Sequence, residues 1–229
     1  VHLHAGGEQM RLRLSNRYGN GPVTLSSISV GHVLQGPVVR PGASVVQFAG
    51  HPTVTLEPSQ ELVSDPVAFA VEAQSDLAIT FFLAQGESMT GHLMAQQMSY
   101  ISGVGDITAA PMEAASFVYP LLTTSWWLIT GIDVLPSAPL NAVVAFGSST
   151  TDGFGSTINA NRRWSDYLDL RLQDAGGTRY MSVLNAGISG NQLTSSEMPH
   201  TAGAGMSLLG GEGGPPFLFG DSGRQRVAW

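Results

Sequence analysis

The sequence predicts two domains of different fold class, an all-β domain over residues 1–132 and an α/β domain over residues 133–229. Three observations lead to this prediction. Short alternating segments recur at intervals of about 8–12 residues through the first part of the chain. A proline-containing stretch, DVLPSAP at 133–139, is typical of a domain junction. A strand–helix–strand pattern then follows, which indicates parallel strands joined by a crossover helix.

The first domain is predicted to be a β-sandwich or jelly roll. In MRLRL at 10–14 the apolar residues alternate with arginines, which is the period of a half-buried strand. The turn sequence YGNGP at 18–22 separates this strand from a second alternating segment at 23–30. Further short segments bounded by Gly, Pro, Asp or Ser lie at 44–48, 53–56, 67–71 and 77–82.

The second domain begins with VVAF at 143–146, a continuous apolar run that is typical of a strand buried on both faces. A helix is predicted over 161–174, because Trp164, Leu168 and Leu172 recur at helical spacing with Tyr167 beside them. A second apolar strand is predicted at 181–186. These three elements form a βαβ unit.

The composition excludes several kinds of chemistry. All 10 basic residues are Arg, and the chain contains neither Cys nor Lys. Thiolate nucleophiles, disulfides, Cys-built metal sites and lysine Schiff bases are therefore excluded. The net charge of −7, without any basic run, argues against nucleic-acid partners and anionic membranes. We also expect no membrane span, since no apolar run approaches about 20 residues.

Two loops rich in glycine and hydroxyl residues follow the two α/β strands. The first, GSSTTDG at 147–153, contains Ser149, and the second is NAGISGN at 185–191. Parallel neighbouring strands would bring both loops to one sheet edge, where ligands bind in open α/β sheets. A hydroxyl nucleophile beside exposed backbone N–H groups is the arrangement that acyl transfer requires. Two ordinary turns would have the same composition, so from chemistry alone both interpretations stay open.

The two loops resemble sequence blocks of the SGNH (GDSL-type) esterase/lipase family. VVAFGSSTTDG at 143–153 resembles the first block and NAGISGN the second, and the intervening NANRRWSDYLDLRL also fits. SWWLITGIDV at 125–134 resembles the junction in bacterial members that have an N-terminal β-sandwich. The resemblance implies that residues 133–229 are the N-terminal part of a three-layer, flavodoxin-like α/β hydrolase domain, incomplete at its C-terminus.

The resemblance also implies a function, the hydrolysis of carboxylic esters through an acyl-enzyme. The expected substrates are small-molecule or carbohydrate esters of short acyl groups such as acetyl. Ser149 would be the nucleophile, and the backbone N–H groups of Ser149 and Gly190 would be oxyanion-hole donors. Asp152 would support the nucleophile loop. Ser148 stands where the family usually has Asp, and Asn191 follows the oxyanion glycine; we count both as supporting residues. No metal or organic cofactor is implied.

Two further family blocks are absent from the 229 residues, G-x-N-D with its oxyanion Asn and D-x-x-H with the general base. We therefore expect a missing C-terminal segment to carry them. The alternative hypothesis is a non-catalytic, glycan-binding β-sandwich protein with an inactive hydrolase remnant. On either hypothesis we favour a secreted protein. We expect Trp126 and Trp127 to pack between the two domains; the alternative is that they form a platform on which a sugar binds.

Other residues suggest sites that we weigh less. GDSG at 220–223 matches the Gly-Asp-Ser pattern of the family's first block more closely than residues 147–149 do. No second glycine block can follow it before the chain ends, however. His2 and His4 could bind a metal weakly, and two solvated imidazoles on a terminal strand are the expectation that we prefer. His92 and His200 are expected to be a structural and a loop histidine.

Overall fold

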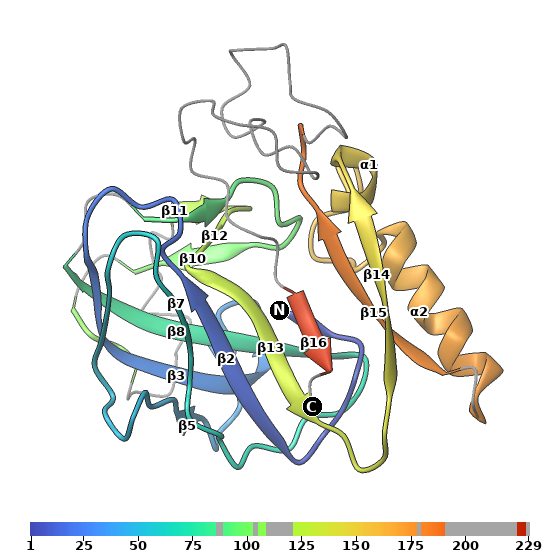
Figure 1. Ribbon diagram of the computed structural model, residues 1–229, viewed down its shortest axis with the longest axis horizontal. Coiled ribbons are helices and arrows are strands. Elements are labelled where there is room, and N and C mark those ends of the chain that lie inside the picture. Colours follow the sequence, from blue (N-terminus) through green and yellow to red (C-terminus); the bar gives the residue numbers. More distant parts are fainter. Residues whose placement is uncertain (86–88, 103–104, 109–120, 178–179, 191–223, 228–229) are drawn as a thin grey trace.

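The computed structural model describes residues 1–85, 89–102, 105–108, 121–177, 180–190 and 224–227. The described chain is mostly β structure with two helices (Figure 1). Its strands are β1 (His2–Leu3), β2 (Gln9–Ser15), β3 (Val23–Gln35), β4 (Val38–Val39), β5 (Ser44–Val45), β6 (Val54–Leu56), β7 (Glu61–Val63), β8 (Ser75–Gln85), β9 (Gly91–His92), β10 (Ser99–Ile101), β11 (Leu121–Thr123), β12 (Trp126–Trp127), β13 (Ile129–Leu135), β14 (Asn141–Gly147), β15 (Met181–Gly187) and β16 (Arg224–Val227). The helices are α1 (Ser149–Asp152) and α2 (Trp164–Ala175).

Two larger sheets form the β part of the molecule. One has six strands in the order β1-β8-β3-β4, with β5 and β6 also paired to β3; the other has the order β16-β13-β2-β7. The alternation predicted for 9–15 is confirmed, because Met10, Leu12 and Leu14 are all buried. They share one core cluster with Ile28 of β3 and Ile132 of β13. Each such side chain contributes about 1.5–3 kcal/mol through its burial.

The predicted βαβ unit is also confirmed. β14 and β15 pair in parallel, from Asn141 opposite Met181 to Gly147 opposite Gly187, and α2 lies between them in the sequence. Figure 1 shows the two strands and α2 together on one side of the molecule, next to the β part. Both predicted loops begin at the same end of this register, where the chain leaves β14 at Gly147 and β15 at Gly187.

The predicted fold class is wrong in its second half, because no three-layer, flavodoxin-like α/β domain is seen. Within the described residues, the parallel sheet has only the strands β14 and β15, and the helices are α1 and α2. A three-layer fold needs an open sheet with helices on both faces. β16 does not extend this sheet, since it pairs in parallel with β13 of the β part. Residues 132 and 133, where we placed the domain boundary, both lie within β13.

Helix α2 buries its polar side. Ser165, Asp166 and Asp169 are its buried residues. Of the residues that predicted the helix, Trp164 and Tyr167 are 45% and 46% exposed, and Leu168 and Leu172 are only partly buried. The helical period was therefore right, although the apolar residues that revealed it are not those that α2 buries.

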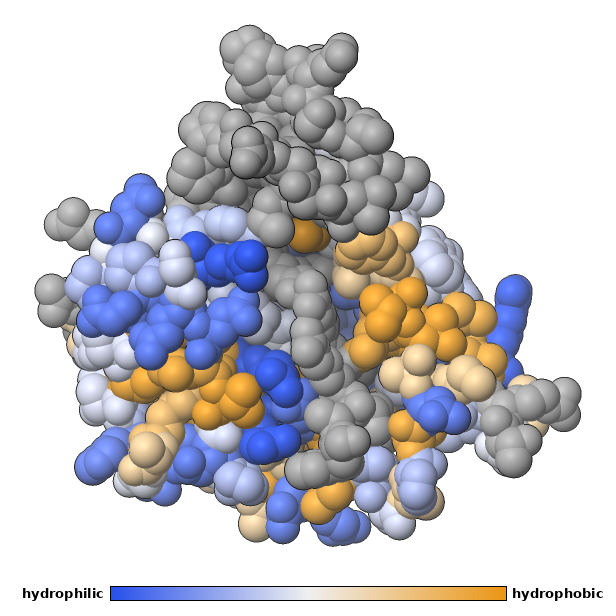
Figure 2. All heavy atoms as spheres, in the orientation of Figure 1, coloured by the Kyte–Doolittle hydropathy of each residue, from blue (hydrophilic) through white to orange (hydrophobic). Residues whose placement is uncertain are grey.

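An apolar patch lies on β14. Val144 and Phe146 are both more than half exposed, and Figure 2 shows an apolar patch on the right, over the region of β14. In the part of the chain that the structure describes, no helix has the length and apolar character needed to cross a membrane.

Candidate active site

The parallel strands bring the two predicted loops together. Gly147 and Gly187 are register partners at the last position of β14 and β15, and the Ile188 N–H donates to the Gly147 carbonyl at 3.1 Å. The turn that contains Ser149 and the loop that contains Gly190 therefore leave the sheet side by side.

Ser149 is the first residue of the short helix α1 and is partly buried. Its carbonyl accepts hydrogen bonds from the N–H groups of Gly153 and Phe154, at 3.0 and 2.9 Å. The Ser149 N–H is among the first N–H groups of α1, which as a rule have no acceptor within their own helix.

Ser148, one of the predicted supporting residues, lies at the N-cap of α1. Its carbonyl accepts the N–H groups of Thr151 and Asp152 at 3.0 and 2.9 Å, and its side chain makes no capping hydrogen bond. Ser148 therefore shapes the turn through its backbone.

Asp152 joins the two loops. Its carboxylate is buried, and its Oδ2 accepts the Ser189 N–H at 2.9 Å and the Ser189 hydroxyl at 2.6 Å. Its Oδ1 accepts Nε2–H of His92 at 2.8 Å. A carboxylate held by three donors fixes the residues that supply them. Asp152 thus has a geometry that suits the supporting role implied by the resemblance.

Two glycines permit this close approach. A Cβ on Gly187 would lie 2.2 Å from the backbone nitrogen of Asp152. Gly190 has a φ of 90°, a region that L side chains rarely adopt. Asn191, the other predicted supporting residue, lies outside the described residues.

A second polar cluster joins α2 to β1 and β15. His4 donates from Nδ1 to the Val183 carbonyl at 2.8 Å and from Nε2 to Asp166 Oδ1 at 3.2 Å. Asp169 Oδ1 accepts the Val183 N–H at 3.1 Å. The expectation of solvated imidazoles is wrong, because the side chains of His2 and His4 are only 11% and 5% exposed.

These contacts set the protonation of the cluster. Burial favours neutral His4, but the Asp166 hydrogen bond and the Asp169 charge outweigh it and raise the pKa of His4. Burial likewise opposes ionised Asp166, yet the His4 hydrogen bond and Arg163 lower the pKa of that carboxyl. Burial raises the pKa of Asp169. The polar side of α2 is therefore buried with its side chains paired and hydrogen-bonded. These contacts offset the free-energy cost of removing the polar groups from water.

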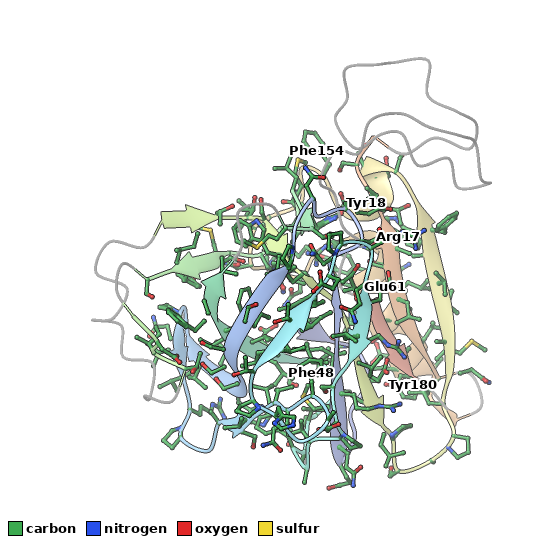
Figure 3. The ribbon with its side chains drawn as sticks, turned by 60° about the vertical axis from the view of Figure 1, so that its left-hand side comes forward. Arg17, Tyr18, Phe48, Glu61, Phe154 and Tyr180 are labelled. Carbon is green, nitrogen blue, oxygen red and sulfur yellow. The ribbon has the colours of Figure 1, made fainter. Side chains whose placement is uncertain are left out.

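Figure 3 shows the two ends of the α/β unit. Phe154 stands at the end where β14 finishes, and Tyr180 lies toward the opposite end of β15. Phe154 is 67% exposed just after the turn that contains Ser149, and the Tyr180 hydroxyl donates to the His4 carbonyl at 3.0 Å. Tyr180 thus joins its end of the unit to the segment that directly follows β1.

A small cavity lies behind the loops. It has a volume of about 50 Å³ and is lined by residues that include His4, His92, Asp152 and Asn185. An ester substrate needs far more room than this, since ligand pockets hold about 300 Å³ or more. This cavity is therefore too small to hold a molecule of that size. Among the described residues, no group of three or more acidic or histidine side chains could hold a metal ion.

The sequence interpretation missed the part played by His92. It lies 60 residues before Asp152 in the chain, on β9, and was expected only to be structural. No local pattern connects the two residues. His200 and the GDSG sequence at 220–223 lie outside the described residues.

Comparison of the chain with protein-family models and with curated proteins finds no match.

Proposed function

We propose that this protein is a serine ester hydrolase and that Ser149 is its nucleophile. The observation that carries the proposal is the pairing of Gly147 with Gly187, which sets the Ser149 turn beside the Ser189–Gly190 loop. Asp152 fastens the two together through Ser189. The resemblance of both loops to SGNH sequence blocks adds support, and so does the exclusion of Cys and Lys as nucleophiles by composition.

The proposed reaction has two steps. Ser149 Oγ transfers its proton to a general base, a histidine as the resemblance implies, and attacks the ester carbonyl carbon. The carbonyl oxygen becomes an oxyanion that accepts hydrogen bonds from the Ser149 and Gly190 N–H groups. Collapse of this intermediate breaks the ester C–O bond; the base returns the proton to the leaving oxygen, so that the alcohol departs and an acyl-serine remains. Water then attacks the acyl group, which releases the carboxylic acid and regenerates Ser149. Exposed Phe154 offers an apolar contact beside the reacting group, which suits a small acyl or aryl substituent.

Hydrolysis of p-nitrophenyl acetate by the full chain tests the proposal. Its leaving group is stable as an anion and needs no proton, so the assay reports on the nucleophile and the oxyanion donors. We expect release of p-nitrophenolate in a burst, stoichiometric with protein, before a slower steady state limited by deacylation. Release at the rate measured in buffer alone would contradict the proposal.

One observation favours a second candidate, glycan binding by the β part. Trp126, Trp127 and Tyr100 line a groove of about 880 Å³, and aromatic side chains with an apolar face and a polar tip suit such ligands. Binding of acetylated oligosaccharides without turnover of either these or p-nitrophenyl acetate would favour this candidate over the hydrolase.

A further inference from the structure

His92 belongs to the β part but reaches the candidate active site. Its strand β9 pairs with β12, with His92 opposite Trp126. The neighbouring Thr90 carbonyl accepts the Leu128 N–H at 2.9 Å, just before β13 begins. The His92 backbone is therefore held by strands of the β part.

The His92 side chain crosses to the nucleophile turn. It is only 3% exposed, and its Nε2 lies 2.8 Å from Asp152 Oδ1. Because a carboxylate only accepts hydrogen bonds, Nε2 carries the hydrogen of this bond. The other oxygen of the same carboxylate holds Ser189. Three segments, β9, α1 and the loop after β15, therefore meet at one buried carboxylate.

We propose that His92 is a positioning residue, which acts through Asp152 on the geometry around Ser149. The β part, which supplies His92, would then be a component of the active site. The proposal rests on the proposed function of Ser149. With its Oδ1 held by His92, the carboxylate has one orientation, and Oδ2 then sets where Ser189 and the adjoining Gly190 lie relative to the turn. His92 itself does not touch the substrate.

This arrangement predicts a loss of rate without a loss of binding. If the His92 donor is removed, Asp152 can turn, and the Gly190 N–H moves relative to Ser149. A misplacement of 1 Å at such a site costs about a hundredfold in rate. The groups that contact the acyl and leaving groups keep their places, so KM should change little.

The matched pair His92→Gln and His92→Asn tests this in the full chain. The Gln amide nitrogen reaches about as far as Nε2, whereas the Asn amide nitrogen stops near the position of Nδ1. We expect His92→Asn to lower kcat for p-nitrophenyl acetate by about 10- to 100-fold at an unchanged KM. It should also speed amide hydrogen exchange at Ser189 by about tenfold or more. His92→Gln should retain both properties to within about threefold, and the exposed control His51→Gln should match wild type.

Several outcomes would overturn the proposal. Wild-type kcat and wild-type Ser189 exchange in His92→Asn would do so, and so would equal losses in the Gln and Asn variants. If His92→Asn does not fold, Ser189→Ala removes the hydroxyl on the other side of Asp152, and an unchanged kcat there would count against the proposal. If wild type itself does not hydrolyse the ester, the esterase function fails, while Ser189 exchange still decides whether His92 holds the loops together.

Discussion

Ser149→Ala is expected to lower kcat for p-nitrophenyl acetate by at least about a thousandfold, because removal of a serine nucleophile leaves only the contribution of the oxyanion donors and of binding. The variant should fold as wild type does. Ser149 is only partly buried, and the hydrogen bonds that shape α1 around it come from its backbone carbonyl. Steady-state kinetics and thermal unfolding of both proteins measure the two properties.

Thr150→Ala is the matched control for this variant. Thr150 is the next hydroxyl residue along the same turn and is exposed, so we expect its removal to leave kcat within about threefold of wild type, as for most surface substitutions. Activity that survives in Ser149→Ala, or that is lost equally in both variants, would remove Ser149 as the nucleophile.

Gly187→Ala is expected to have the second-largest effect. The new Cβ would lie 2.2 Å from Asp152 N and 2.6 Å from the carbonyl carbon of Thr151, which are backbone atoms that cannot rotate away. The end of β15 must then separate from α1. We expect a loss of about 1–3 kcal/mol in the free energy of unfolding and a fall of about a hundredfold in kcat. Urea unfolding and ester hydrolysis measure the two effects.

Gly21→Ala is the control for this substitution, because a Cβ at Gly21 would meet no atom within 4 Å. It should leave both stability and kcat close to those of wild type. If Gly187→Ala behaved in the same way as Gly21→Ala, the close contact between the two loops would be contradicted.

From the sequence, the site could be predicted only where local residue patterns determine the structure. The strands at 143–146 and 181–186 follow from apolar runs, and parallel pairing then places Gly147 opposite Gly187. The contact between Asp152 and His92 depends instead on how the βαβ unit packs against the β part, which no local pattern encodes.

The burial of α2 could not be predicted for a related reason. Periodicity counts apolar residues, and in α2 these lie mainly on the exposed side. Asp166 can be buried because it is hydrogen-bonded to His4, which directly follows β1 and lies more than 160 residues away in the chain. The three-layer prediction was wrong because a single βαβ unit was extended to a whole domain, whereas β16 pairs with β13.

Covalent labelling tests whether Ser149 is the activated hydroxyl that we propose. A phosphonofluoridate reacts with an activated serine when Oγ attacks phosphorus and fluoride leaves, and peptide mapping then locates the phosphonyl group. We predict one adduct per chain, on Ser149, formed by the folded protein and not by the denatured one. An adduct on Ser222 of the GDSG sequence, or equal labelling of folded and denatured chains, would contradict the claim.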